Sequence, residues 1–356
     1  MNKGMSIYLE LIRVIATLLV LLSHAIELAP EALQVVLSEL RLGRDGVILF
    51  FVLSGYVITW CAIEKEKEWK KFAISRAARI YSVAIPGLLL GIMVSLFISF
   101  QQTTPVDYTI QKAWIYYPLF LTFNSQSWLG FIFPAGNFPY WSLSFEVWYY
   151  IFFGTLLFAK KLKVVAVVAA LLLMGPYIIL FLPLWGLGSV LYFAKDKFVP
   201  SRLIASMLFC ITLGLFIAIK INHFDNTADA YNVALFGSLS SYLPAKQFLG
   251  DYLLAIIATI NFYAAYHLNV PFNRVTTNVI KTVAGFSFSI YMFHTPLLLL
   301  LENTVFVETH NYFAFYAAML ITLSVCYALS LFTEKKKNIV SNLLYKVFSH
   351  RKNEQG

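Results

Sequence analysis

Ionisable side chains, among them Glu10, Arg13 and His24, interrupt the first apolar segment of the chain, which runs from 7 to 28. If this segment is a helix, Arg13 and His24 share one face about three turns, or about 16 Å, apart, and Glu10 lies on the same face. An arginine near the middle of a bilayer costs about 2.5–3.5 kcal/mol, so its presence favours a functional role. Imidazole titrates near neutral pH and can take a proton from a hydroxyl group. We therefore expect Arg13 and His24 to belong to a reaction centre inside the membrane.

A purely structural explanation stays open for each of these three residues. Glu10 and Arg13 would then neutralise each other near the inner membrane interface, with the arginine extending toward the headgroups. His24 would be a hydrogen-bonded histidine of a helix bundle, without a role in chemistry.

A pair of arginines, Arg76 and Arg79, lies in a basic segment that follows the second apolar run. Residues three apart share a helical face, and paired guanidinium groups suit the phosphates of an anionic cytoplasmic metabolite. The pair therefore predicts a phosphate-binding site. The alternative is that both arginines only orient the protein in the membrane and contact lipid headgroups.

Glu146 and His294 are two further ionisable residues within apolar runs. Counted along their helices, both reach about the depth of His24, in the outer part of the membrane. A carboxylate at that depth can orient an imidazole and stabilise its protonated form, so we predict Glu146 as the partner of His24. His294 is either a packing residue or part of a second polar wall of the same cavity. Trp141, the first residue of the run that carries Glu146, is a supporting candidate for the site.

The second apolar run contains Asp45 near its start and the sequence Ser54-Gly55-Tyr56 further along. Small residues at 54 and 55 permit close approach of two helix backbones, which is typical of helix packing rather than of chemistry. Asp45, Ser54 and Tyr56 are retained only as supporting candidates for the site.

The composition indicates that these residues are positioned by membrane-spanning helices. Hydrophobic residues make up 60% and charged residues 13% of the 356 residues, where a soluble domain would have about 45–50% and about 25%. Apolar runs long enough to span the hydrocarbon region occur near 7–28, 45–63, 80–100, 141–159, 162–181, 184–195, 202–220, 249–267, 282–302 and 311–333. The run 184–195 is short, and joining it to its neighbour would leave nine. The expected fold class is an all-α polytopic membrane bundle of about ten transmembrane helices.

The distribution of charge predicts the orientation of this bundle. The net charge is +9, and most of the 27 basic residues fall in short blocks between apolar runs, which favours membrane orientation over nucleic-acid binding. With about ten spans, these blocks share one side if both termini are cytoplasmic. We expect a transmembrane domain over 1–334 and a basic cytoplasmic tail over 335–356. The three cysteines have no CxxC spacing, so no metal site is expected.

Five short motifs, taken together and in order, resemble the membrane-bound acyltransferase 3 family. They are Arg13 with His24, Phe50-Phe51 with Ser54-Gly55-Tyr56, Arg76 with Arg79-Ile80, Trp141-Ser142-Leu143 with Glu146, and Tyr291 with His294. Each motif alone is weak, but the match runs from residue 8 to about 296. Glu10 stands where the family more often has Asp, and Arg44-Asp45-Gly46 matches the family's second helix only in part.

The resemblance implies an acyl-CoA donor, usually acetyl-CoA, taken from the cytoplasm, and O-acylation of cell-envelope carbohydrate in a bacterial inner membrane. It carries the essential roles onto Arg13, His24, Arg76 and Arg79. The acceptor would be a polysaccharide such as the O-antigen of lipopolysaccharide, an exopolysaccharide or a lipid-linked glycan, met by the membrane domain itself. Oligomeric state and acceptor identity are not predicted.

These expectations combine into one hypothesis with two alternatives. The donor phosphates bind Arg76 and Arg79, the pantetheine arm passes Arg13, and His24 either deprotonates the acceptor hydroxyl or is acetylated first. A secondary transporter would instead use the buried Glu, Arg and His residues as a proton or anion path. A non-catalytic partner of a glycan assembly complex is the third reading.

Overall fold

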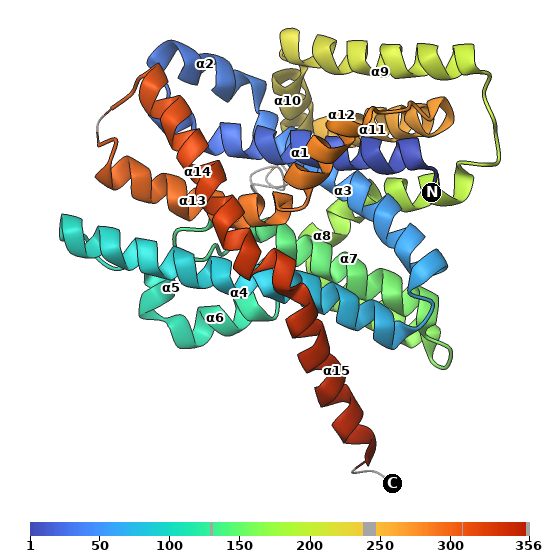
Figure 1. Cartoon of the computed structure of the whole chain (residues 1–356), viewed down its shortest axis with the longest axis horizontal. Helices are drawn as coiled ribbons and strands as arrows, with labels where there is room; N and C mark the ends of the chain where they lie inside the picture. Colours follow the sequence, from blue (N-terminus) through green and yellow to red (C-terminus); the bar gives the residue numbers. More distant parts are fainter. Residues whose placement is uncertain (129–130, 238–246, 308, 354–356) are drawn as a thin grey trace. The chain divides into compact units, whose positions relative to one another are not determined.

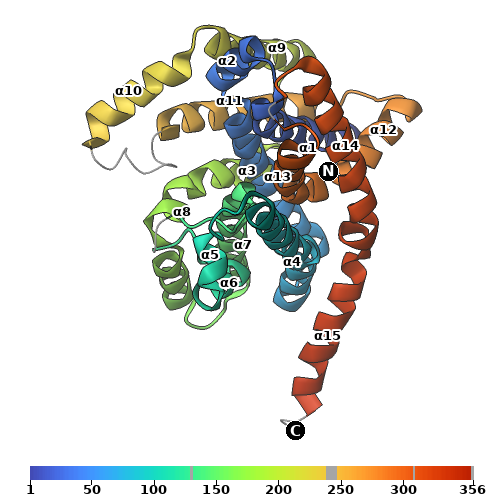
Figure 2. The same cartoon turned by 90° about the vertical axis from the view of Figure 1, so that its left-hand side faces the viewer.

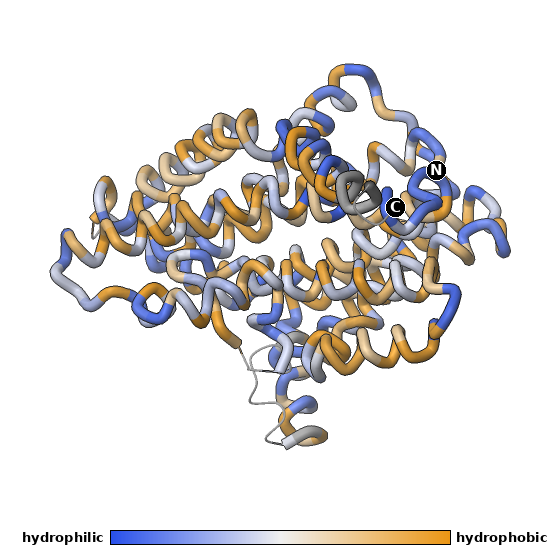
Figure 3. The backbone as a smooth tube through the Cα atoms, turned by 90° about the horizontal axis from the view of Figure 1, so that it is seen from below, coloured by the Kyte–Doolittle hydropathy of each residue, from blue (hydrophilic) through white to orange (hydrophobic). Residues whose placement is uncertain are grey.

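The computed structural model describes residues 1–128, 131–237, 247–307 and 309–353 (Figure 1). Every regular element within these ranges is helical, and no strand occurs among them. This confirms the all-α class. Hydrophobic residues predominate along the described helices, whereas many hydrophilic residues lie toward the turns and chain ends (Figure 3).

Seven helical segments of the described chain are long and apolar enough to cross a membrane. They are Lys3–His24, Glu31–Lys65, Trp69–Gln102, Lys163–Ala194, Arg202–Ile221, Phe248–Leu268 and Tyr312–Val347. The pair α12 (Arg274–Ala284) and α13 (Ser287–Thr304), bent by 51° at its break, qualifies together as an eighth. The chain is therefore a multi-pass membrane protein.

This count differs from the expected ten spans for two reasons. The runs 162–181 and 184–195 form one helical segment, α8 (Lys163–Ala194), whose backbone kinks at Gly175 (φ 78°) instead of ending between the two runs. The run 141–159 forms α7 (Trp141–Phe158), whose serines, tyrosines and Glu146 lower its mean hydropathy, so that it is not among the seven.

The chain folds into two compact units, of which the first comprises Met1–Ser23, Ala32–Cys61 and Gly175–Ala284. Its helices are α1 (Lys3–His24) up to Ser23, nearly all of α2 (Glu31–Leu40), α3 (Leu42–Trp60), the second part of α8, α9 (Arg202–Ile221), α10 (Phe224–Phe236), α11 (Phe248–Leu268) and α12. Within this unit α11 packs against both α9 and α3.

Two glycines allow α3 and the second part of α8 to approach closely within the first unit. A Cβ atom on Gly55 would overlap the carbonyl oxygen of Trp185, and one on Gly188 would overlap the carbonyl oxygen of Val52. The packing interpretation of the small residues at 54 and 55 is confirmed for Gly55. The indole Nε1–H of Trp185 also donates to the Ser54 hydroxyl at 3.2 Å, so Ser54 contributes to this helix contact.

The second unit comprises His24–Glu31, Ala62–Met174 and Gly285–Gly356. Its elements are η1 (Ile26–Leu28), α4 (Trp69–Gln102), α5 (Tyr108–Gln111), α6 (Ala113–Leu121), η3 (Phe138–Tyr140), α7, the first part of α8, α13, α14 (Tyr312–Phe332), η6 (Glu334–Lys336) and α15 (Lys337–Asn353). The helix α4 packs against α7, α13 and α15, and α13 packs against α14. The short helix η6 joins α14 to α15 (Figure 2).

Candidate functional site

Two histidines lie side by side in the second unit. His24 is the last residue of α1, His294 lies on α13, and their ring centroids are 5.1 Å apart. The ring of Phe138, from η3, meets the His24 ring at 6.1 Å with an interplanar angle of 60°. The structure thus brings His294 next to the predicted catalytic histidine.

The hydrogen bonds of His294 define its tautomer. Its Nδ1 lies 2.9 Å from the Ile290 carbonyl oxygen, which can only accept, so Nδ1 carries a proton. In the neutral ring Nε2 is then an acceptor, and the Thr295 hydroxyl lies 3.3 Å from it. Because the His294 side chain is fully buried, these contacts hold its ring in one orientation beside His24.

Asn137 is a residue of this region that sequence reasoning did not single out. Pro296 has no N–H, so the Met292 carbonyl on α13 lacks its usual helical donor. The buried side-chain amide of Asn137 replaces it, donating to Met292 at 3.0 Å and to the Gly87 carbonyl on α4 at 3.2 Å. Asn137 therefore joins α4 and α13 next to Phe138. The proline indicates that a donor is needed, but it does not indicate which residue supplies it.

Glu146 lies on α7 among aromatic hydroxyl groups. The Tyr150 hydroxyl donates to the Glu146 carboxylate, and Tyr291 lies close enough to interact with it electrostatically. Tyr291 shares a 2.6 Å hydrogen bond with Ser142 at the start of the same helix. Trp141 packs edge-on against Phe145, with ring centroids 5.2 Å apart. The pairing of Glu146 with His24 stays a prediction.

Arg76 forms a buried ion pair with Glu66, a residue that was not among the site residues expected from the sequence. Its Nη2 lies 2.7 and 2.9 Å from the two carboxylate oxygens of Glu66 and 3.2 Å from the Ser75 hydroxyl. Ser75 also donates to Glu66 at 2.7 Å. Arg79, one turn further along α4, is half-buried, and both arginines interact electrostatically with the Tyr150 hydroxyl. The structure therefore brings Arg76, Arg79 and Glu146 together around Tyr150.

A cavity of about 550 Å³ lies between α4 and α7 in the second unit. Its walls are mostly apolar and include Phe72, Ala77 and Gly154. Arg76 is the one charged side chain among the described residues that line it, and Arg79 does not line it. The Arg76 Nε has no hydrogen-bond partner among the described residues, although it is buried. The cavity thus has an apolar interior and one hydrogen-bond donor without a partner.

Other predicted site residues belong to the first unit. Glu10 and Arg13 are both half-buried on α1, and one carboxylate oxygen of Glu10 is buried without a hydrogen-bond partner among the described residues. Tyr56 is fully buried and meets Tyr192 edge-on at 5.9 Å. The proposed path of a donor past Arg13 to His24 stays a prediction.

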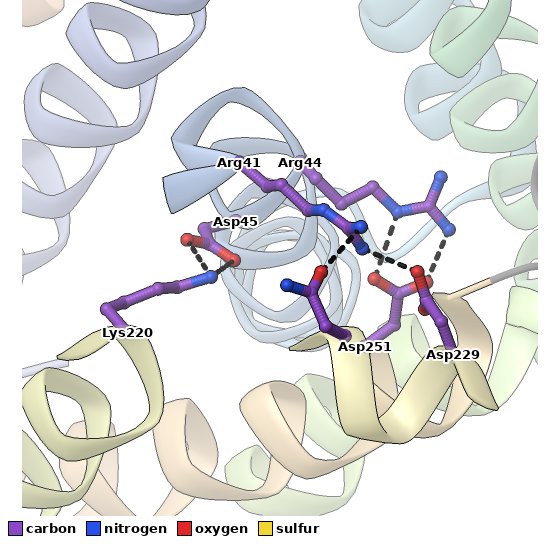
Figure 4. A network of polar contacts seen from close by, with 7 residues as sticks. Arg41, Arg44, Asp45, Lys220, Asp229 and Asp251 are labelled. Carbon is purple, nitrogen blue, oxygen red and sulfur yellow. Dashed lines mark hydrogen bonds and ion pairs between the residues drawn. The ribbon is translucent and has the colours of Figure 1, made fainter. Parts of the chain in front are cut away.

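Asp45 belongs to a network of ion pairs in the first unit (Figure 4). Its carboxylate binds the Lys220 ammonium group at 2.7 and 2.9 Å, and both side chains are buried. Near the start of α3, Arg44 binds Asp251 through two hydrogen bonds, and Arg41 binds Asp229 at 2.5 Å. Each acidic side chain of this network has a basic partner.

The described residues contain no group of three or more His, Cys, Asp or Glu side chains that could hold a metal ion. What they do contain is a pair of adjacent imidazoles, fully buried at His294 and half-buried at His24, together with a carboxylate among hydroxyl groups and a guanidinium group at a cavity. The imidazoles and the carboxylate can transfer protons. The guanidinium group can bind the polar part of a ligand whose apolar part lies in the cavity.

The fold and these groups define a multi-pass membrane protein with a polar centre among apolar helices. The family model of the acyltransferase domain, acyltransferase 3, matches residues 6–331, and the chain belongs to this family. It is therefore a membrane acyltransferase, and the resemblance seen in the motifs is confirmed. Comparisons with curated proteins and with solved structures found no match.

Proposed function

We propose that this membrane acyltransferase transfers an acetyl group from cytoplasmic acetyl-CoA to a hydroxyl group of a cell-envelope glycan or lipid-linked oligosaccharide in a bacterial inner membrane. The observation that carries the proposal is the contact between His24 and His294, 5.1 Å apart, in a chain of the acyltransferase 3 family. Two adjacent imidazoles, one fully buried and one half-buried, are suited to holding and moving a proton.

In the proposed reaction His24 accepts the proton of the acceptor hydroxyl group, and the oxygen of that hydroxyl group attacks the thioester carbonyl carbon. The carbon–sulfur bond breaks, the ester forms, and the thiolate of coenzyme A leaves and takes up the proton from His24. In the alternative route His24 itself is acetylated and passes the group to the hydroxyl. In both routes His294 acts as a positioning residue, because its own ring is held by Ile290 and Thr295.

The donor would be bound by Arg76 and Arg79, with Arg13 along its path. Glu66 already occupies one nitrogen of Arg76, so donor phosphates would compete with this carboxylate for the guanidinium group. Glu146 acts in this proposal as the carboxylate that stabilises the protonated imidazole. Glu10, Asp45, Ser54, Tyr56 and Trp141 have supporting structural roles.

The test uses full-length protein reconstituted in vesicles with acetyl-CoA radiolabelled in the acetyl group and glycan from the source cells. Wild-type protein is expected to move label to the glycan, and His24→Ala is expected to lose this activity while eluting as a folded protein. Transfer by His24→Ala at the wild-type rate would remove this residue from the mechanism. The same assay separates an acyltransferase from the transporter alternative, because a carrier would leave the acetyl group on coenzyme A.

A further inference from the structure

The cavity between α4 and α7 has the size and shape of an acyl-chain site. Its lining on α4 extends from Trp69 to Tyr81, a rise of about 18 Å. One leaflet of a bilayer has a hydrocarbon depth of about 15 Å, half of the roughly 30 Å core. The volume of about 550 Å³ falls in the range of about 300–1,000 Å³ that is usual for ligand sites.

The chemistry of the walls favours an uncharged chain that carries a hydrogen-bond acceptor. The charge of Arg76 is balanced by Glu66, while its buried Nε has no hydrogen-bond partner among the described residues. A buried N–H without a partner is unfavourable, so a ligand oxygen near this atom would be stabilising. The ester carbonyl of a lipid is an acceptor of this kind.

Charged residues beside one end of the cavity favour an anionic headgroup. Ala159 and Ala166 both line the cavity, and the segment between them contains Lys160, Lys161 and Lys163, all of which are exposed. Each lysine near a membrane surface raises the affinity for anionic lipid about fivefold. We infer that this cavity binds an acyl chain of an anionic phospholipid, with the lipid phosphate near these lysines and a carbonyl oxygen at Arg76.

The inference is tested by native mass spectrometry of the delipidated full-length protein with added phosphatidylglycerol or phosphatidylcholine. We expect one phosphatidylglycerol per chain, preferred at least tenfold over phosphatidylcholine. Ala77→Phe fills the cavity and is expected to weaken this binding at least tenfold. Leu89→Phe is the matched control, because Leu89 is 55% exposed on the same helix and does not line the cavity.

A second variant keeps the inference testable if Ala77→Phe fails to fold. Replacing Lys160, Lys161 and Lys163 by glutamine leaves the cavity walls intact and is expected to remove the preference for phosphatidylglycerol. The inference is overturned if Ala77→Phe folds and binds phosphatidylglycerol like the wild type, or if the glutamine variant keeps the preference. Lipid binding by His24→Ala should equal that of the wild type, so this inference and the proposed reaction can fail separately.

Discussion

Replacing Asn137 by alanine tests whether one buried amide holds α4 and α13 together. The side chain is 1% exposed and donates to the carbonyl oxygens of Gly87 and Met292. The Gly87 carbonyl keeps a helical donor four residues further along α4. The Met292 carbonyl does not, because the corresponding residue is Pro296.

The magnitude follows from these two acceptors. Losing the bond to Gly87 removes a net contribution of about 0.5–1.5 kcal/mol, and leaving Met292 unsatisfied costs about 1–3 kcal/mol. Hydrogen bonds between membrane helices average about 0.6 kcal/mol, so the lower part of the combined range is the better expectation. We expect Asn137→Ala to lower the free energy of unfolding by about 2 kcal/mol.

Reversible unfolding in mixed micelles, followed by circular dichroism, measures this change. The decisive comparison repeats Asn137→Ala in a Pro296→Ala background, where residue 296 regains its N–H and can donate to Met292. The cost of Asn137→Ala should fall there by about 1 kcal/mol or more, a coupling expected of groups that share one acceptor. An equal cost in both backgrounds would refute the reasoning. Asn124→Ala, which removes only hydrogen bonds to residues within three positions of it in the chain, should change stability by less than about 0.5 kcal/mol.

Three further outcomes are expected. Asp45→Asn or Lys220→Met alone should destabilise the protein by about 3–5 kcal/mol in the same unfolding assay, and the double variant should recover much of this loss, because a single change leaves a buried charge unpaired. His294→Gln should lower kcat for glycan acetylation by about tenfold to a hundredfold without changing the KM for acetyl-CoA, and a change confined to KM would place it in donor binding. Glu66→Gln should lower the KM for acetyl-CoA if the donor binds Arg76, whereas an unchanged KM would separate that arginine from the donor.

The sequence located most of the helices because the signal for a membrane span is local. A run of apolar residues of sufficient length is favourable as a helix in lipid whatever surrounds it. Thus the expected runs 202–220 and 249–267 correspond closely to α9 and α11. Around α8 the sequence left nine or ten spans open, because the kink there depends on the backbone conformation of Gly175 rather than on hydropathy.

The family could also be recognised from the sequence, since the motifs around Arg13, His24, Arg76 and Glu146 occur in a fixed order. The residues that contact these side chains in space could not be predicted from the sequence. Glu66 lies only ten residues before Arg76, but Glu64 and Glu68 stand beside it in the sequence and only the folded chain distinguishes them.

The sequence by itself indicated that the protein lies in a lipid bilayer, where its spans approximately are and to which family it belongs. Hydrophobicity, helix length and the order of motifs can all be read along the chain without knowing how it folds. The tertiary structure decided which polar groups meet: His24 with His294, Asp45 with Lys220 and Asn137 with Met292. A polar group inside apolar surroundings must find a partner, but many partners satisfy this requirement equally well. Only the packing of distant helices selects one of them.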